Sequence, residues 1–346
     1  MRNKLAVLTA VCFCLPAWAV DAPASFANAN IEVRSGRAPA AALDDAARGK
    51  STTWVGWSVP AVPEALGACC FTNNFKRTGC SLADRDNSWG TTDDCDRTGP
   101  TELYVLVESK GGKPNRVRVM SPTCPVEGAG TRVVWLGPVD PGASLAALTR
   151  LLDAEPNRDR VGEPALAAIA HHQDARVDAL LEKRAFDRSL SKEAREQAIF
   201  WAGNVRGEAG YRLIERVLTS ESMGDFREHA VFALTQSSVP GASDRIKRVA
   251  LEDRDHDVRA QALFWLSQTN VEGAGEWIVG RLDAEQDDHV REQAIFALSQ
   301  LDDGTDWLLK VLRSKRDPET IRRALFWLAQ SDDPRALQEI EKILDK

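Results

Sequence analysis

The segment Arg195-Glu-Gln-Ala-Ile-Phe-Trp-Ala202 decides the fold of the second half of the chain, because versions of it recur at a nearly fixed interval. Its first six residues return unchanged at Arg291–Phe296. Weaker copies begin at Arg227, Arg259 and Arg322, so the five lead arginines are separated by 32, 32, 32 and 31 residues. A repeat of this length is typical of solenoids, in which similar two-helix units stack on one another.

The helical pattern starts before the first full copy. Pro141 and Gly142 mark a boundary, and helical periodicity continues from there to the C-terminus. One period before Arg195, the segment that begins at Glu163 looks like a degenerate first copy, as is usual for a terminal repeat. The sequence therefore predicts an all-α solenoid of about six helix pairs over residues 142–346.

An acidic turn precedes most lead arginines and is followed by Val-Arg-x-x-Ala-(Leu/Ile)-Phe-x-Leu. This pattern resembles the HEAT-repeat family, in particular the short bacterial HEAT-like repeats also seen in phycobilin lyases (PBS-lyase-type repeats). The resemblance implies a right-handed stack of antiparallel helix pairs that serves as a scaffold. It also implies a ladder between turn aspartates and lead arginines, here Asp225 with Arg227, Asp257 with Arg259 and Asp288 with Arg291. The first full copy lacks the aspartate, which suggests that the ladder begins one repeat later.

The N-terminus has the pattern of a cleaved export signal. Arg2 and Lys4 precede the apolar run Leu5–Leu15, and Ala17-Trp18-Ala19 fits a small-x-small cleavage site. The apolar run is too short to span a bilayer. We therefore expect cleavage after Ala19, which removes residues 1–19 as a signal peptide, and a periplasmic or secreted protein without membrane insertion. A retained N-terminal anchor is the alternative.

The charge of the chain disfavours some partners. The formal net charge is −7, and loss of the two basic residues of the signal would make it −9. Such an acidic chain is a poor partner for nucleic acid or an anionic lipid surface. A protein partner of unspecified identity fits better, and no cofactor is expected.

Residues 20–141 show short strands instead of helical periodicity, and we expect a small β-rich domain. Glu102–Glu108 and Arg116–Met120 flank a glycine turn, which predicts a hairpin with Arg116 and Arg118 on its solvent-exposed face. The five cysteines that remain after signal cleavage all lie in or near this region: Cys69, Cys70, Cys80, Cys95 and Cys124. In an exported protein they are candidates for up to two disulfides, and the sequence leaves the pairing open.

One face of each lead helix is a candidate binding surface. At 100° per residue, Val258 and Leu263 face the core, whereas Phe264 and Gln268 lie on the other side. The same positions in all copies form two columns: Phe200, Phe232, Phe264, Phe296, Phe326 and Asn204, Gln236, Gln268, Gln300, Gln330. Because second helices line the concave side of curved repeat stacks, we hypothesise that these columns bind a protein partner. The alternative is that the phenylalanines fill space between repeats and the amides bridge neighbouring turns.

The next position along each lead helix alternates between large and small residues. It is occupied by Trp201, Ala233, Trp265, Ala297 and Trp327. An indole has room beside an alanine, so this alternation predicts interdigitated packing between adjacent repeats.

No catalytic residue set emerges from the sequence, and it lacks the usual nucleophile, phosphate-binding and dinucleotide-binding motifs. His171 and His172 are adjacent in the degenerate first copy, and His229, His256 and His289 lie in separate repeats. We therefore expect surface histidines and no metal site. In Asp253-x-Asp255-x-Asp257 the positions that a calcium loop needs for Gly and Glu hold Val258 and Phe264, which favours helix capping. Whether the acidic loop over residues 84–96 binds calcium stays open.

Two classes of function remain. The first is an exported protein–protein interaction scaffold or adaptor that binds a partner through the concave face of the solenoid and performs no catalysis. The alternative is a lyase-like enzyme or small-molecule handler built on HEAT-like repeats. The candidate face carries phenylalanines, amides and the carboxylates Glu196, Glu228 and Glu292, without a paired base at fixed spacing. This composition favours binding.

Overall fold

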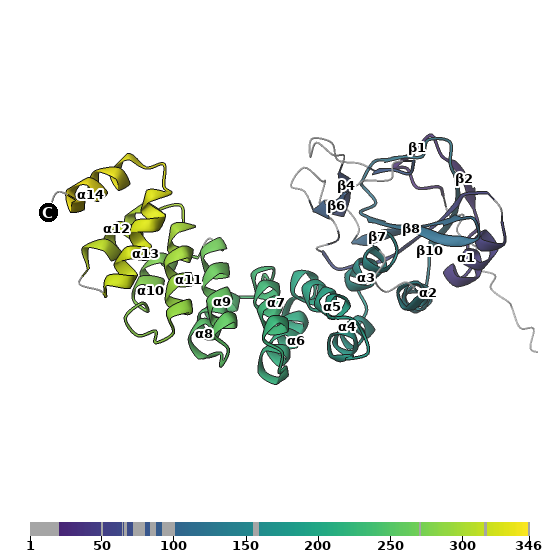
Figure 1. The fold of residues 1–346 in the computed structure, drawn as a ribbon. Coiled ribbons are helices and arrows are strands. Elements are labelled where there is room, and N and C mark those ends of the chain that lie inside the picture. Colours follow the sequence, from purple (N-terminus) through teal and green to yellow (C-terminus); the bar gives the residue numbers. More distant parts are fainter. Residues whose placement is uncertain are drawn as a thin grey trace, which may run out of the picture.

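The chain forms a β-rich N-terminal region followed by a curved row of helices (Figure 1). The computed structural model describes residues 21–49, 51–63, 65, 68–71, 80–83, 88–91, 101–154, 159–269, 271–314 and 317–344. The expected signal peptide, residues 1–19, lies outside these ranges, and of the acidic loop 84–96 only residues 88–91 fall within them. Within the described ranges, every helix is too short or too polar to cross a bilayer.

Five strands form the main sheet of the N-terminal region. They lie in the order β2-β10-β3-β7-β8, with bounds Asn30–Val33, Arg132–Pro138, Thr53–Pro60, Glu102–Lys110 and Lys113–Met120. β10 runs parallel to β2 and β3, whereas β3, β7 and β8 are antiparallel neighbours. The expected hairpin is present as β7 and β8, joined through Gly111 and Gly112, whose φ angles of 60° and 77° suit a tight hairpin turn.

Shorter elements complete this region. β1 (Phe26–Ala27), β9 (Val126–Glu127) and β5 (Cys80–Ser81) form a small sheet in that order. β4 (Ala68–Phe71) pairs with β6 (Ser88–Thr91), and α1 (Pro39–Arg48) packs against β3 and β7. Strand residues alternate between two cores, because successive side chains point to opposite faces of the sheet. One core continues into the helices, and the other lies beneath the small sheet.

Cys80 and Cys124 belong to the core beneath the small sheet. Both are buried, and both are disulfide-bonded. The side chains of Cys69, Cys70 and Cys95 lie outside the described part of the chain. The pairing of the five cysteines therefore stays a prediction.

The expectation that Arg116 and Arg118 face solvent is wrong. Both are buried, and Arg116 contacts Leu82, the residue after β5 of the small sheet, which lies on this side of the main sheet. Arg116 donates to both carboxylate oxygens of Glu108, at 2.8 and 2.9 Å, and to the carbonyl of Leu82 at 2.9 Å. Burial alone would raise the pKa of Glu108, but hydrogen bonds from Arg116 and Asn115 bring it below its ordinary value. The sequence thus placed Arg116 and Arg118 on the same face of the sheet correctly, but it did not predict that this face is also covered.

The sheet and the first helices share a polar contact inside their common core. α2 (Pro141–Ala154) brings Ser144 between Trp57 of β3 and His172, which follows α3 (Gly162–His171). The Trp57 indole donates to the Ser144 hydroxyl at 2.8 Å, and the His172 Nε2 lies 2.9 Å from the same oxygen. His171 is buried beside it, so the expectation of surface histidines is wrong for this pair. Burial lowers the pKa of each to about 4.

Beyond α3 the helices pack as a row that fits a solenoid. Their bounds are α4 Arg176–Phe186, α5 Lys192–Val205, α6 Gly207–Ser220, α7 Gly224–Thr235, α8 Ala242–Glu252, α9 His256–Gln268, α10 Ala274–Val279, α11 Asp288–Ser299, α12 Gly304–Arg313, α13 Pro318–Ala329 and α14 Pro334–Leu344. α5, α7, α9, α11 and α13 contact one another in sequence and lie along the inner side of the curve (Figure 1). We call these five the inner helices.

Local sequence sets where the inner helices start. The side chains of Ser191, Asp255, Asp287 and Asp317 each accept hydrogen bonds from backbone N–H groups in the first turn of α5, α9, α11 and α13. Such caps satisfy donors that have no partner within the helix. Asp255, Asp287 and Asp317 therefore act as helix caps. For Asp255 this agrees with the sequence, which favoured helix capping over a calcium loop.

The buried histidine pair predicts a loss of stability in mild acid. The unfolded chain takes up protons near pH 6.5, whereas each buried histidine resists protonation until about pH 4. The free energy of unfolding should therefore be fully present above pH 6.5 and fall by about 1.4 kcal/mol per pH unit for each histidine below it. Urea denaturation from pH 7 to 4.5 measures this slope. Carboxylates titrate in the same range, so the comparison is with His171→Gln, whose slope should be shallower; identical slopes would contradict the assignment.

Candidate functional site

The lead arginines form a ladder along the inner helices. Arg195 and Arg227 reach carboxylates 26 residues downstream, Glu221 at 2.7 Å and Asp253 at 2.8 Å. Arg259 lies 3.6 Å from the corresponding Glu285. From the second copy on, each arginine also donates to the backbone carbonyl of the preceding acid: Arg227 to Glu221 at 3.2 Å, Arg259 to Asp253 at 2.9 Å and Arg291 to Glu285 at 3.0 Å. Each acid thus joins two consecutive arginines.

The first two rungs of the ladder are largely buried, and the pKa of each carboxylate there is lowered. Arg195 and Arg227 are only 4% and 2% exposed. Burial would raise the pKa of Glu221, but the hydrogen bond from Arg195 and two backbone N–H groups lower it to about 2. The same balance lowers the pKa of Asp253 through Arg227. A buried charge that lost its partner would be strongly unfavourable, so each rung fixes the spacing between two repeats.

The predicted ladder was wrong in its partners. Asp225 binds Lys192 at 2.8 Å and Asp257 lies beside His289 at 3.3 Å, so neither contacts its expected arginine. Only Asp288 meets the arginine assigned to it, Arg291. The true acids do carry a sequence signal, because Glu221, Asp253 and Glu285 are spaced at steps of 32 residues.

The last copy was also placed one residue out of register. The N-cap residue of each inner helix lies four residues before the lead position, and by this rule the cap Asp317 assigns the lead position of α13 to Ile321. Arg322 is instead 76% exposed and pairs with Glu319 in its own helix turn. Phe326 keeps the register of the phenylalanine column, so the arginine of this copy is simply absent.

The phenylalanine column forms a continuous line of rings across the inner helices. Phe200 stacks on Phe232 and Phe264 on Phe296, each pair with ring centroids 5.9 Å apart. Tryptophans complete the line: Trp265 lies 4.7 Å from Phe232 and Trp327 lies 4.9 Å from Phe296. These two tryptophans pack on phenylalanines of the preceding repeat, and the expected packing beside alanines stays a prediction.

These rings pack against one another and remain partly exposed to solvent. The first four phenylalanines are half-buried, and Phe326, on the last inner helix, is 56% exposed. Gln268, Gln300 and Gln330 beside the rings are exposed. The amides of Gln236 and Gln300 donate to the hydroxyl of the preceding residue, at 2.9 and 3.1 Å, and do not bridge neighbouring turns. The structure therefore presents an aromatic line flanked by amides along the inner side of the row.

Carboxylates flank this line at the N-terminal ends of the inner helices. Burial raises the pKa of Glu196 and of Glu228, and nearby aspartates raise that of Glu228 further. His229 lies between repeats with its ring 5.6 Å from Phe232, and burial lowers its pKa. Lys192 bridges Glu196 and Asp225. The charge of this edge is therefore mostly negative.

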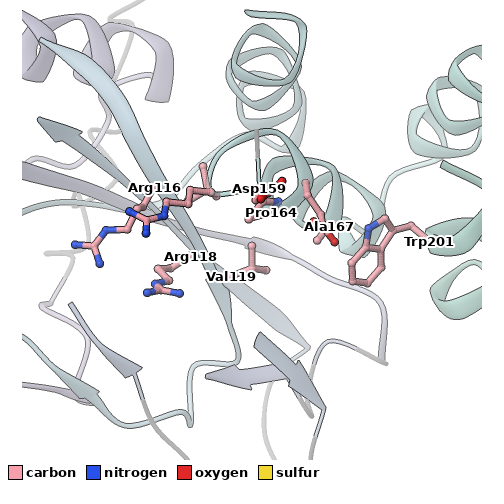
Figure 2. Close-up of a pocket in the computed structure, with 10 residues that line it drawn as sticks. Arg116, Arg118, Val119, Asp159, Pro164, Ala167 and Trp201 are labelled. Atoms are coloured by element: carbon pink, nitrogen blue, oxygen red, sulfur yellow. The ribbon is translucent and has the colours of Figure 1, made fainter. Parts of the chain in front are cut away.

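A pocket of about 230 Å³ lies where the sheet meets the helices (Figure 2). β8 contributes Arg116 and Arg118, α3 contributes Ala167, and Trp201 of α5 closes the far side, as Figure 2 shows. Glu163 also lines it, and burial raises the pKa of this carboxyl. The pocket therefore combines arginines, an acid and an indole, none of which the sequence had grouped.

The inner helices also bring metal-ligating side chains together, which the scattered histidines had not predicted. His256, Asp257 and His289 converge at the start of α9 and α11, with contacts of 3.3 and 3.5 Å between imidazole nitrogens and the Asp257 carboxylate. This cluster is separate from the pocket between the sheet and the helices, which we call the junction pocket, since none of the cluster residues lines it.

Comparison with known proteins identifies the repeats. Residues 212–299, from α6 to α11, match the family model of HEAT repeats, so the chain carries HEAT repeats there. Among solved structures, human deoxyhypusine hydroxylase in complex with glycerol is similar at 18% identity, covering 55% of this chain and 74% of that chain, with a TM-score of 0.28. No curated protein matches the chain.

The ladder predicts that its arginines differ sharply from other surface arginines. Arg227→Ala would remove both guanidinium hydrogen bonds that the Asp253 carboxylate accepts, and one of the two arginine donors to the carbonyl of Glu221. We expect the free energy of unfolding to fall by roughly 3–5 kcal/mol. The matched control is Arg322→Ala, which removes an exposed arginine one residue after the lead position of α13. This variant should change the free energy of unfolding by no more than about 0.5 kcal/mol. Chemical denaturation compares the two variants, and equal losses would contradict the ladder.

Proposed function

Because residues 212–299 carry HEAT repeats, we propose that this protein is an exported interaction scaffold that binds a protein partner along its inner helices. The full array in this proposal comprises six helix pairs, from α2 and α3 to α12 and α13, with α14 closing the end. The observation that carries the proposal is the half-exposed aromatic line that runs across all five inner helices.

The chemistry of this surface indicates the kind of partner that fits. Aromatic rings supply apolar contact area at low entropic cost, and amides such as Gln268 and Gln300 supply hydrogen bonds to a backbone. The flanking carboxylates Glu196, Glu228 and Glu292 favour basic side chains. We propose an extended segment of a protein partner with apolar and basic residues, laid along the inner side of the row.

A small-molecule handler is the alternative that the junction pocket would serve. Its volume of about 230 Å³ falls below the roughly 300–1,000 Å³ of most sites for drug-sized ligands. Its guanidinium groups are also engaged, since Arg116 is held by Glu108 and Leu82. These features support the scaffold over a lyase-like enzyme.

Binding is tested with substitutions that leave the core untouched. Gln268→Lys combined with Gln300→Lys places two cations at exposed positions beside the aromatic line. The full chain is used to capture proteins from the cell envelope, which are then identified by mass spectrometry. The amount of partner captured by this variant should fall at least about tenfold, a loss of binding free energy of ~1.4 kcal/mol. The melting temperature should not change, because the two side chains are exposed.

The control for this experiment lies on the outer side of the row. Leu251 of α8 is 46% exposed, and Leu251→Lys adds a cation away from the inner helices. This variant should capture the partner as well as the unaltered protein does. Equal capture by the glutamine variant and the unaltered protein would contradict the proposed surface.

The export part of the proposal has its own test. Cleavage after Ala19 would give a mature chain that begins at Val20, with a formal charge more negative by two units than the −7 of the full sequence. We expect this N-terminus in the mass spectrum of protein from the cell envelope or medium. An intact Met1 in that fraction would instead support the retained anchor.

A further inference from the structure

Two histidines and an aspartate from consecutive repeats meet at the edge of the inner helices. His256 is the first residue of α9 and His289 is the second residue of α11. The Nε2 atoms of His289 and His256 lie 3.3 and 3.5 Å from the same oxygen of Asp257. The centroids of the two imidazole rings are 5.5 Å apart. The stacking of the repeats, and no local motif, creates this cluster.

The separations match those between ligands of one metal ion. Zinc binds imidazole nitrogen and carboxylate oxygen at about 2.0–2.2 Å in tetrahedral geometry. Two ligand atoms of such a tetrahedron lie about 3.3–3.5 Å apart, by simple trigonometry on those bond lengths. The 3.3 and 3.5 Å separations, each between an imidazole nitrogen and the same Asp257 oxygen, match two edges of a tetrahedron, and a bound ion would draw the two imidazoles together along the third edge.

A fourth residue orients one of the imidazoles. His256 Nδ1 lies 3.1 Å from Asp287 Oδ2, and the other oxygen of Asp287 is held by the backbone N–H groups of His289 and Val290. Donation from Nδ1 to a fixed carboxylate leaves Nε2 with its lone pair directed away, toward Asp257. This carboxylate–histidine arrangement is the usual support of a metal-ligating histidine.

We propose that His256, His289 and Asp257 bind a divalent transition-metal ion such as zinc, with Asp287 as the residue that positions His256. The ligand side chains are 44–57% exposed, so a remaining coordination position faces solvent. Asp255 is near enough to fill it, because ligand atoms of Asp255, His256 and Asp257 lie within 4.8 Å of one another. Two imidazoles favour a metal of the zinc, nickel or copper type over calcium or magnesium.

The remaining turns of the inner helices serve as internal comparisons. The turn before α7, Met223–Asp225, and the turn before α13, Asp317–Glu319, contain acidic residues but no histidine. Asp225 there pairs with Lys192. The proposed site is therefore specific to the boundary between α9 and α11, where a bound ion would cross-link two repeats. Binding to the folded form alone would then raise the melting temperature.

The experiment uses the untagged full chain, stripped with a chelator and titrated with ZnCl₂ in a calorimeter near pH 7.5. We expect one zinc ion per chain, bound at micromolar concentration or tighter, and a higher melting temperature. His289→Ala and Asp257→Asn should each weaken binding by at least tenfold. Asp287→Asn keeps a helix cap but loses the orienting charge, and should weaken binding by roughly 10–100-fold.

Controls separate the site from general attraction of metal to an acidic surface. Asp225→Asn removes the corresponding carboxylate one repeat earlier and should leave zinc affinity unchanged. Co²⁺ should give the visible absorption bands of tetrahedral coordination, and His289→Ala should abolish them. Binding should weaken strongly near pH 5, where imidazoles take up protons (ordinary pKa about 6.5). Absence of zinc binding, or zinc binding that the His289 and Asp257 variants leave unchanged, would overturn the proposal.

Discussion

The middle of the array depends on a chain of largely buried charges that links consecutive repeats from Arg195 to Glu285. Arg227 illustrates it, since its guanidinium binds the Asp253 carboxylate on one side and the carbonyl of Glu221 on the other. Replacing such a network by apolar residues need not cost stability, because desolvation offsets much of the attraction. Its effect is on geometry: an arginine that must meet two partners permits only one offset between neighbouring helix pairs. This constraint recurs along the curved row of helices seen in Figure 1.

The aromatic line has a double role that follows from where its rings lie. A phenylalanine such as Phe232 packs on a ring from the next repeat and keeps one edge at the surface. Because each ring is already ordered by its neighbours, binding would immobilise few side chains and lose little conformational entropy. Packing and recognition are therefore compatible at these positions. The two interpretations of the column need not exclude one another, and only the exposed amides beside it separate them experimentally.

Sequence periodicity predicted the helices, the inner face and the hairpin, because each depends on neighbours along the chain. It failed where a contact depends on stacking. The partner of Arg195 is 26 residues away, and the approach of His256 to His289 spans two repeats. The register error at Arg322 arose from following arginines alone, although the cap Asp317 and Phe326 carried the correct alignment. Arg116 was assigned to solvent because the small sheet above it is built from short, distant strands.

The hydrogen bonds around Ser144 have a mechanical consequence. Because Trp57 and His172 share one hydroxyl inside a common core, buried side-chain contacts couple the sheet to the first helices. A partner bound to the β-rich region would therefore also position the first helices of the row.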